Sequence, residues 1–463
     1  MKASAYLYSL FDNKGIVRRD LPESKFAPQK APGKTSEEFN SREIKKIGEP
    51  KPQQPKLVSS CEGKINSMLL TIPLDSEDFA AIYKKLLETL PEYTSLVCLV
   101  NSGSKAMVEN WLKTYKRDET SIVVEAPDSV GFSIWAQDAY ALTTSNEQVY
   151  FVEPLSFLRY ADAVIADYVT NATNTKNFQV PLYFQGGNIL VGDDFWLIGA
   201  DYPKKSLEYI NNAIFANDGE TSEQLVKRLF QENLDTSREL TYVASPIPVP
   251  ADDVMLTQEN GQFFVDMVFQ GNESGTVQPL FHIDMFLTLA GRDATGKYQI
   301  LVGDPSMAPI HPSVNPPAVY SMQNVYDAIA DFFKSSGFNV IRNPLPLTFS
   351  TEKVQLEKLN VPDYQPIYEI YLKLHNLGLT EVELRSWYFA TANNALVENT
   401  ASCKRVWLPT YGYEEYEYLQ ESDRKNQEIW QNLGFEVTML PNFHSLASGL
   451  GAVHCIQKYI ERG

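Results

Sequence analysis

The chain of 463 residues contains few cysteines and no long apolar run. Its four cysteines are scattered along the sequence and none forms a C-x-x-C pair, which argues against a disulfide framework. No apolar stretch reaches the roughly 18 residues that a membrane-spanning helix requires. The N-terminal residues lack the continuous apolar segment of a secretory signal. We therefore expect a cytoplasmic protein with reduced thiols and no membrane partner.

Positive charge is also in short supply. Lys and Arg together number 40 against 58 Asp and Glu, which gives a net charge of −18. Binding to nucleic acid depends on neutralising phosphates with Lys and Arg, so a nucleic-acid partner is not expected. An acidic protein attracts cations and basic peptides instead. The charge thus permits a cationic substrate and leaves the oligomeric state open.

The N-terminal part of the chain differs in composition from the rest. Between Leu21 and Ser59 it is rich in Lys, Pro, Glu, Ser and Gln and poor in branched apolar residues. A segment of this composition buries too little apolar surface to offset the conformational entropy lost on ordering. We predict a tail or surface strap over residues 1–60 and one folded domain, which carries the candidate site, over residues 61–463.

Within the folded part, a unit of two short strands, a helix and a third strand recurs. The strands are runs of apolar, β-forming residues bounded by turn residues, and the helices show one apolar face. We expect the first strands of four copies at Ala139–Thr143, Asn188–Val191, His282–Leu289 and Ala395–Val397. Strand Ser67–Ile72 and the C-terminal run His454–Ile460 can supply a fifth copy. This order predicts one closed, pseudo-five-fold α/β domain, joined through its N- and C-terminal segments.

Polar residues lie near the start of the first strand in each copy. They are Asp138, Asn188, His282 with Asp284, Asn394, and Cys455. If equivalent strand ends converge on a central axis, these residues meet although they are far apart in the sequence. Because side chains alternate along a strand, we expect His282 and Asp284 on one face, and His454 facing away from the site.

Each of these residues also has a purely structural interpretation. Cys455 can be an inert buried thiol, since cysteine is often buried. His282 and Asp284 can be a polar pair satisfied within a sheet, and Asp138 can cap a turn. Gly186-Gly187-Asn188 is typical of a tight turn and is too short for a phosphate-binding loop.

Other kinds of site are less well supported by the sequence. A zinc site of Cys, His and Asp would need close-spaced ligand pairs, and only the adjacent His454 and Cys455 are close. A serine hydrolase would need a Gly-x-Ser-x-Gly elbow, whose first glycine is missing before Ala447-Ser448-Gly449. The local sequence that surrounds a papain-like cysteine is also absent.

Five short motifs together resemble the guanidino-group-modifying (pentein) superfamily. They are Trp135-Ala-Gln-Asp138, Gly186-Gly-Asn-Ile-Leu, His282-Ile-Asp284, Asn393-Asn394 and Gly451-Ala-Val-His-Cys455. The motifs at Trp135 and Gly451 resemble the protein-arginine deiminase form, and the motif at Gly186 resembles that of agmatine deiminases. The likeness runs from about Ser67 to the C-terminus, as spaced motifs in the right order.

The resemblance implies a fold and a set of roles. The fold would be a five-bladed propeller of ββαβ units. Cys455 would be the nucleophile, His282 the general acid and base, and Asp138 and Asp284 the carboxylates that bind the guanidinium. Trp135, Gln137, Asn188 and Asn394 would contact the substrate, and neither a metal nor an organic cofactor would take part.

Two positions depart from the family pattern. Phe281 stands where the deiminases have a glycine before the histidine, and Gln137 replaces the arginine of agmatine deiminases. We therefore expect a deiminase that converts peptidyl or free arginine into the ureido product and ammonia. The alternatives are an agmatine deiminase, an amidinotransferase that passes the amidino group to an amine, and a non-catalytic binder of arginine or basic peptides.

Overall fold

The computed structural model describes residues 51–463, except 75–78, 156, 158, 160, 211–216, 218, 269–275 and 315–317. Within these residues one arrangement recurs: two antiparallel strands, a helical segment, and a third strand parallel to the second. The predicted order of elements is therefore confirmed. Of the tail or strap expected over residues 1–60, residues 1–50 lie outside the described residues.

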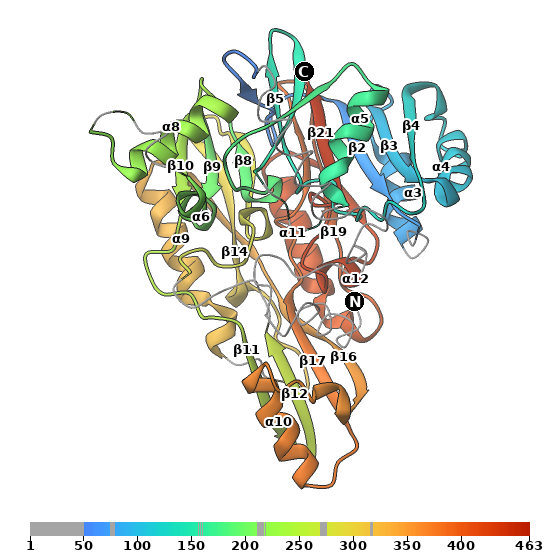
Figure 1. Cartoon of the computed structure of the whole chain (residues 1–463), viewed down its shortest axis with the longest axis vertical. Coiled ribbons are helices and arrows are strands. Elements are labelled where there is room, and N and C mark those ends of the chain that lie inside the picture. The colour runs from blue at the N-terminus through green and yellow to red at the C-terminus, as the bar shows by residue number, and fades with distance from the viewer. Residues whose placement is uncertain are drawn as a thin grey trace.

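Four such units follow one another along the chain (Figure 1). The first comprises β5 (Ala141–Ser145), β6 (Gln148–Glu153), α5 (Ile165–Ala172) and β7 (Lys176–Gln179). The second comprises β8 (Ile189–Val191), β9 (Phe195–Gly199), α6 (Asp201–Tyr209), α8 (Ser222–Leu234) and β10 (Glu239–Val243). The third comprises β13 (Leu287–Arg292), β14 (Tyr298–Asp304), α9 (Gln323–Ser335) and β15 (Asn339–Pro344). The fourth comprises β18 (Leu396–Asn399), β19 (Lys404–Pro409), α11 (Gln420–Asn432) and β20 (Glu436–Leu440).

A further sheet combines both ends of the folded part. The last strand, β21 (Gln457–Arg462), pairs antiparallel with β2 (Ile65–Ile72). Helix α3 (Ala80–Thr89) leads to β3 (Ser95–Asn101), and α4 (Ser102–Thr114) leads to β4 (Ser121–Ala126); these strands extend the sheet in parallel. The short strand β1 (Lys56–Leu57) pairs with β5. Among the described residues no sheet closes on itself, so a closed propeller stays a prediction.

Local sequence explains why the helices begin, end and pack where they do. Helix α8 begins with a capping box, in which Thr221 and Gln224 satisfy each other's backbone amides. Helix α9 buries Val325, Ile329 and Phe333, which recur every three to four residues, and packs on β14 and β15. No helix in the described ranges is both long enough and apolar enough to cross a membrane.

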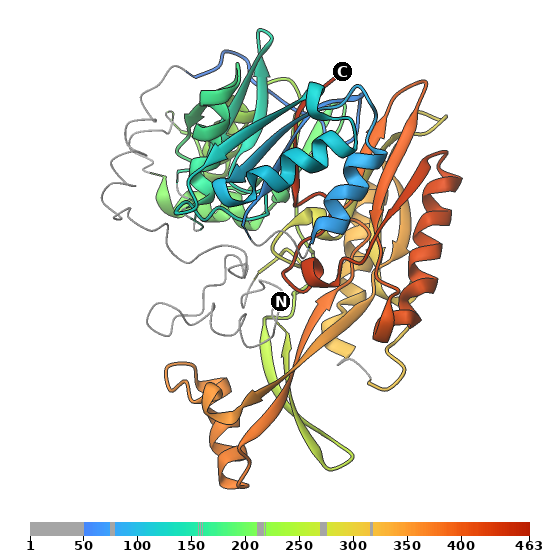
Figure 2. The same cartoon turned by 90° about the vertical axis from the view of Figure 1, so that its right-hand side faces the viewer.

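A protruding lobe is the main feature that the sequence did not lead us to expect. Hairpin β11 (Asp253–Glu259) and β12 (Gln262–Val268) joins a second insertion, formed by β16 (Leu347–Gln355), α10 (Gln365–Asn376) and β17 (Glu381–Phe389). The two insertions form one sheet that projects from the rest of the molecule (Figures 1 and 2). The turn Asn260-Gly261, with φ of 50° and 83°, is a hairpin signal that the sequence does contain. This sheet and α10 enclose a separate apolar cluster.

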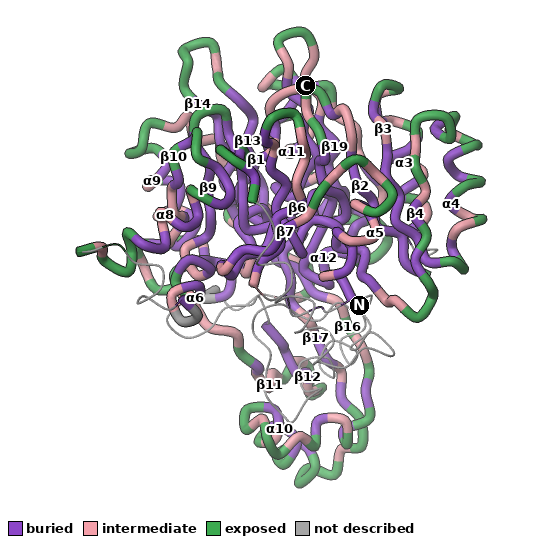
Figure 3. The backbone as a smooth tube through the Cα atoms, turned by 45° about the horizontal axis from the view of Figure 1, so that its top comes forward, coloured by how far each residue is buried: buried purple, intermediate pink, exposed green. Residues whose placement is uncertain are grey.

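The site residues precede the repeat strands and are not part of them. Strand β13 begins at Leu287, so His282 lies in extended backbone and Asp284 in a 3-10 turn. Strand β21 begins at Gln457, and Cys455 lies in a turn just before it. The expectation of alternating side chains at these positions was therefore wrong. These connections run through the buried centre of the molecule (Figure 3).

We predict that the lobe is destabilised locally when its own apolar cluster is opened. Leu384 in β17 is fully buried in that cluster, and its replacement by Ala should cost about 2–5 kcal/mol in unfolding free energy. Amide hydrogen exchange should accelerate in β12 and α10 while β14 stays protected. An equal loss of protection throughout the chain would show that the lobe is not packed independently.

Candidate active site

Cys455, Asp284 and Asn394 meet at the centre of the described structure. The Cys455 Sγ lies 3.8 Å from Asp284 Oδ2. Asn394 contacts the cysteine twice: its Nδ2 donates to Sγ at 3.1 Å, and its Oδ1 accepts from the Cys455 amide at 3.2 Å. The side chain of Asn394 therefore fixes the position of the thiol from two directions, which the sequence alone did not indicate.

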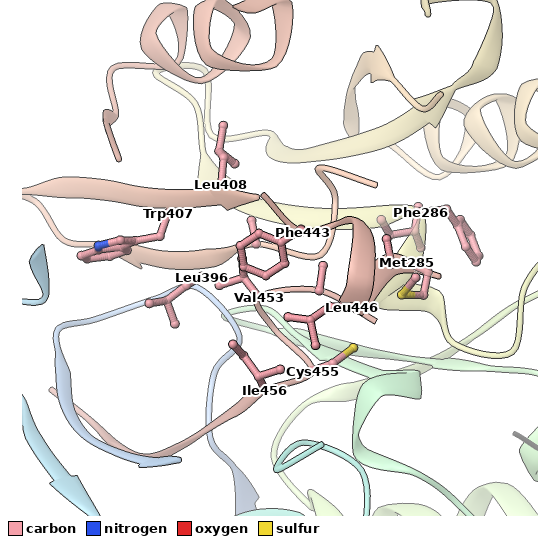
Figure 4. Close-up of a cluster of buried hydrophobic side chains, with 14 of the residues drawn as sticks. Met285, Phe286, Leu396, Trp407, Leu408, Phe443, Leu446, Val453, Cys455 and Ile456 are labelled. Carbon is pink, nitrogen blue, oxygen red and sulfur yellow. The ribbon is translucent and has the colours of Figure 1, made fainter. Parts of the chain in front are cut away.

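The thiol is part of the largest apolar cluster and is not on an open surface. Cys455 lies among Met285, Leu446, Val453 and Ile456 in this cluster (Figure 4). Burial, followed by the negative charges of Asp284 and Asp138, raises the pKa of Cys455 well above its usual value, and the hydrogen bond from Asn394 opposes this shift. In the free protein at neutral pH, Cys455 is therefore a thiol.

Asp138 is held by a buried arginine. Arg159 Nη2 donates to Asp138 Oδ2 at 2.7 Å, and both side chains are 4% exposed. The same guanidinium donates from Nε to Asp162 Oδ2 at 2.5 Å. Asp162 in turn accepts from the amide and the hydroxyl of Ser133. Because Asp162 anchors Arg159, one oxygen of Asp138 is fixed, and the other has no donor among the described residues.

His282 lies beside Asp138. Its Nε2 is 2.7 Å from Gln185 Oε1, so Nε2 carries a hydrogen and donates. Its Nδ1 is 3.7 Å from Asp138 Oδ1 and makes no hydrogen bond within the described part. Gly187 makes this arrangement possible, since a Cβ there would lie 2.5 Å from Nδ1. Burial lowers the pKa of His282, and the nearby carboxylates oppose the shift, so the imidazole is neutral at neutral pH.

The expectation that His454 faces away from the site is wrong in one respect, because its side chain contacts Asp284, although it does not line the cavity that Cys455 lines. Its Nδ1 lies 2.8 Å from Asp284 Oδ2. The expectation assumed an extended segment, in which neighbours point to opposite faces; residues 453–456 form a turn instead. His454 and Cys455 therefore both reach Asp284.

Three buried polar atoms of these residues make no hydrogen bond within the described part of the chain. They are Asp138 Oδ1, Asp284 Oδ1 and His282 Nδ1. The four residues Asp138, Asp284, His282 and Cys455 are 3%, 1%, 0% and 2% exposed. Buried polar groups are normally paired, and an unpaired carboxylate oxygen is costly. The arrangement therefore suits a ligand that donates hydrogen bonds and carries positive charge.

Two partly open cavities, of about 340 and 230 Å³, lie in this region; Asp138 and Cys455 line the smaller one, and neither cavity is lined by Asp284 or His282. The smaller, which we call the thiol cavity, is lined by Trp135, Asp138, Arg159, Phe281, Gly449, Leu450 and Cys455. The ring of Phe281 lies 4.3 Å from that of His282, which it shields on one side. The thiol cavity thus combines an apolar wall with a carboxylate, a cation and a nucleophile.

The remaining residues expected at the site differ in whether they contact the thiol, line one of the two cavities or support the backbone. Trp135 lines the thiol cavity, and Asn394 contacts the thiol directly. Gln137 lines the larger cavity and is not among the residues that line the thiol cavity. Asn188 accepts from the Ile283 amide at 3.1 Å and from Gln278 at 2.8 Å, so it supports the turn between His282 and Asp284.

Sequence reasoning missed Arg159, Gln185 and Lys458. Arg159 lies in a segment with no motif, and only its spacing to Asp162 hints at the pair that the two residues form. Lys458 looks like an ordinary polar residue of the last strand, yet it is buried, and burial lowers its pKa to about 7. The sequence did contain a signal for this burial, because Lys458 lies within the predicted apolar run His454–Ile460.

The fold has clear counterparts among solved structures. A candidate agmatine deiminase, which was a Northeast Structural Genomics target, superposes with a TM-score of 0.53 and 13% identity, over 88% of this chain and 96% of that chain. The agmatine deiminase of C. jejuni superposes with a TM-score of 0.51 and 11% identity, over 88% and 96%. The chain has the fold of the agmatine deiminases. No protein-family model and no curated protein sequence matches it.

We predict that the Cys455 thiolate is absent from the free protein at neutral pH. The difference in thiolate ultraviolet absorbance between wild type and Cys455→Ser should appear only at alkaline pH, because burial and two carboxylates disfavour the anion. A bound guanidinium ion should move this titration to lower pH, because a cation stabilises the thiolate. A thiolate signal at neutral pH in the free protein would contradict the assignment.

Proposed function

We propose that the chain hydrolyses the guanidinium group of a small molecule, with Cys455 as the nucleophile. The observation that carries this proposal is a pair of buried carboxylates next to a buried thiol: Asp138 and Asp284 each have one oxygen with no hydrogen bond to the described residues. A guanidinium is planar, permanently charged and rich in N–H donors, so it can satisfy both free oxygens at once. The match to the fold of agmatine deiminases supports the same class of substrate.

The first half of the reaction forms a covalent intermediate. Asp138 and Asp284 hold the guanidinium so that its central carbon, Cζ, faces Cys455 Sγ. The bound cation offsets the effect of the two carboxylates and stabilises the thiolate. Sγ forms a bond to Cζ, and His282 passes the proton of the thiol to the departing amino group. The Cζ–N bond breaks, ammonia leaves, and the amidino group stays on the sulfur.

The second half consumes water. His282, neutral again, takes a proton from a water molecule whose oxygen attacks Cζ. The Cζ–Sγ bond breaks, the sulfur recovers one proton as a thiol, and the second proton of the water leaves the site. The product carries a ureido group, so the sum is guanidinium plus water giving urea derivative plus ammonium.

The burial of the reacting groups favours a small substrate over a protein arginine. All four chemical groups are almost fully buried, so a protein arginine would have to open the cavity first. Arg159 lines the same cavity, but its charge is already compensated by Asp138 and Asp162, so it does not discriminate between arginine and agmatine. Free arginine is the proposed substrate because Trp135-Ala-Gln-Asp138 resembles the protein-arginine deiminase form, and agmatine is the second candidate because of the shared fold.

The rival functions differ in the fate of the amidino group. An amidinotransferase would transfer the group to an amine in place of water, and a non-catalytic binder would not need the thiol at all. Ureido product and ammonia should therefore be measured with arginine, agmatine and an arginine peptide, with and without added amines. Ureido product from none of them in wild type would overturn the proposal.

We predict that Cys455→Ala abolishes turnover, with a loss of about 10⁴-fold or more in kcat. Cys403→Ala is the matched control, because Cys403 is a free cysteine that is only partly buried and lies just before β19. It should keep wild-type kcat and KM. Equal activity in Cys455→Ala and Cys403→Ala would exclude Cys455 as the nucleophile.

We also predict that Asp138→Asn and Asp284→Asn weaken substrate binding by about 10- to 100-fold, because each removes one charge-assisted hydrogen bond. Binding should be measured in the Cys455→Ala background, where no turnover occurs. Asp193→Asn is the control, because Asp193 pairs with Arg292 at the surface. Unchanged binding in both site variants would contradict the assignment of the two carboxylates.

A further inference from the structure

The larger cavity, of about 340 Å³, lies next to the thiol cavity and shares no lining residue with it. Gln137, Gly186, His454 and Lys458 line it, together with residues of the N-terminal segment such as Val58. Gln137 and His454 immediately precede Asp138 and Cys455, which line the thiol cavity. One layer of backbone therefore separates the two cavities, and polar side chains project from it into the larger one.

His454 connects this layer with Asp284. Gln137 Nε2 donates to the Gly186 carbonyl at 3.1 Å, which fixes the orientation of the amide. The same Nε2 lies 3.5 Å from His454 Nε2, so this ring nitrogen accepts. The hydrogen of His454 is then on Nδ1, which donates to Asp284 Oδ2 at 2.8 Å. The result is a buried chain of hydrogen bonds from Gly186 through Gln137 and His454 to Asp284.

Lys458 supports the same chain from the last strand. Its Nζ donates to the Gln137 carbonyl at 3.2 Å, in a fully buried position. Gly186 allows the amine to come so close, because a Cβ there would lie 2.7 Å from Nζ. The backbone of Gln137 is thereby tied to β21, and its side chain is tied to His454. These contacts all lie on the side of the larger cavity.

We propose that His454 is a positioning residue of the guanidinium site, which holds Asp284 by Oδ2 and so keeps the carboxylate beside Cys455 with Oδ1 free for the cation. Gln137 keeps the imidazole in the tautomer that donates to Asp284, and Lys458 fixes the backbone of Gln137. The inference rests on the proposed function, because it takes Asp284 as a guanidinium ligand. It assigns His454 a task that the proposed reaction does not give it, since the proton transfers belong to His282.

Asp138 has the corresponding arrangement on the other side. Arg159 occupies its Oδ2 as His454 occupies Oδ2 of Asp284, and in each carboxylate Oδ1 has no donor among the described residues. Each carboxylate therefore has one oxygen oriented by a protein donor and one oxygen left for the substrate. Without His454, Asp284 would lose the donor that orients it in a buried position and would be free to turn away from Cys455.

The test uses two substitutions that differ only in whether the donor survives. In His454→Asn the side-chain amide can donate from the place of Nδ1, and in His454→Leu no donor remains. Methylguanidinium serves as the probe in the Cys455→Ala background, with binding measured by calorimetry. The His454→Leu substitution should weaken methylguanidinium binding by about 10- to 100-fold. The His454→Asn substitution should leave the affinity within about threefold of that of the Cys455→Ala protein. In the protein that keeps Cys455, His454→Leu should raise KM more than it lowers kcat.

Val58→Ala is the matched control, because Val58 lines the same cavity and its apolar side chain cannot hydrogen-bond to the chain from Gly186 to Asp284. It should leave binding unchanged. A lower melting temperature in His454→Leu with unchanged methylguanidinium binding would overturn the inference. Equal losses of methylguanidinium affinity in His454→Asn and His454→Leu would also overturn it. If methylguanidinium does not bind the Cys455→Ala protein and wild type converts no guanidine, the proposed function itself fails, which is a separate outcome.

Discussion

The burial of two carboxylates beside a thiol is the constraint on which the rest of the site depends. A buried carboxylate costs several kcal/mol unless a partner compensates it. Arg159 compensates Asp138 and His454 compensates Asp284, each through one oxygen. The second oxygens are left for a ligand, in surroundings where the attraction to a cation is strong because water is excluded. The same burial raises the pKa of Cys455 and keeps the thiol protonated until positive charge arrives.

The repeated units bring these groups together. Asp138, His282, Asn394 and Cys455 each lie just before a strand of a different sheet, in connections buried within the molecule. The strands that follow are each hydrogen-bonded into a sheet and provide rigid supports, so the connections can hold costly groups at fixed distances. The pairing of β21 with β2 brings the C-terminal segment, and with it Cys455, back against the N-terminal sheet. The protruding lobe has its own apolar cluster, and its strands β12, β16 and β17 also contribute Val268, Phe349 and Phe389 to the main cluster.

Much of the architecture could be predicted from periodicity. Runs of apolar residues, turn residues and helical faces indicated the order of strands and helices in each unit, and Val325, Ile329 and Phe333 form such a face in helix α9. The lobe was missed because its halves, 253–268 and 347–389, are far apart in sequence and form one sheet only in three dimensions. The start of β13 was misplaced because His282-Ile-Asp-Met285 alternates polar and apolar residues as a strand does, and periodicity does not distinguish a buried turn from a strand.

The sequence by itself determined which residues were candidates, since Asp138, His282, Asp284 and Cys455 stand out by type and by their place in each unit. Only the tertiary structure decided how they are used. Arg159 on Asp138, Asn394 on Cys455 and His454 on Asp284 are contacts between separate units or loops, and His454 and Asp284 are 170 positions apart. Sequence patterns report local geometry, because they follow from the pitch of a helix or a strand. The choice of which oxygen is free arises from partners that folding brings together, and no local pattern encodes it.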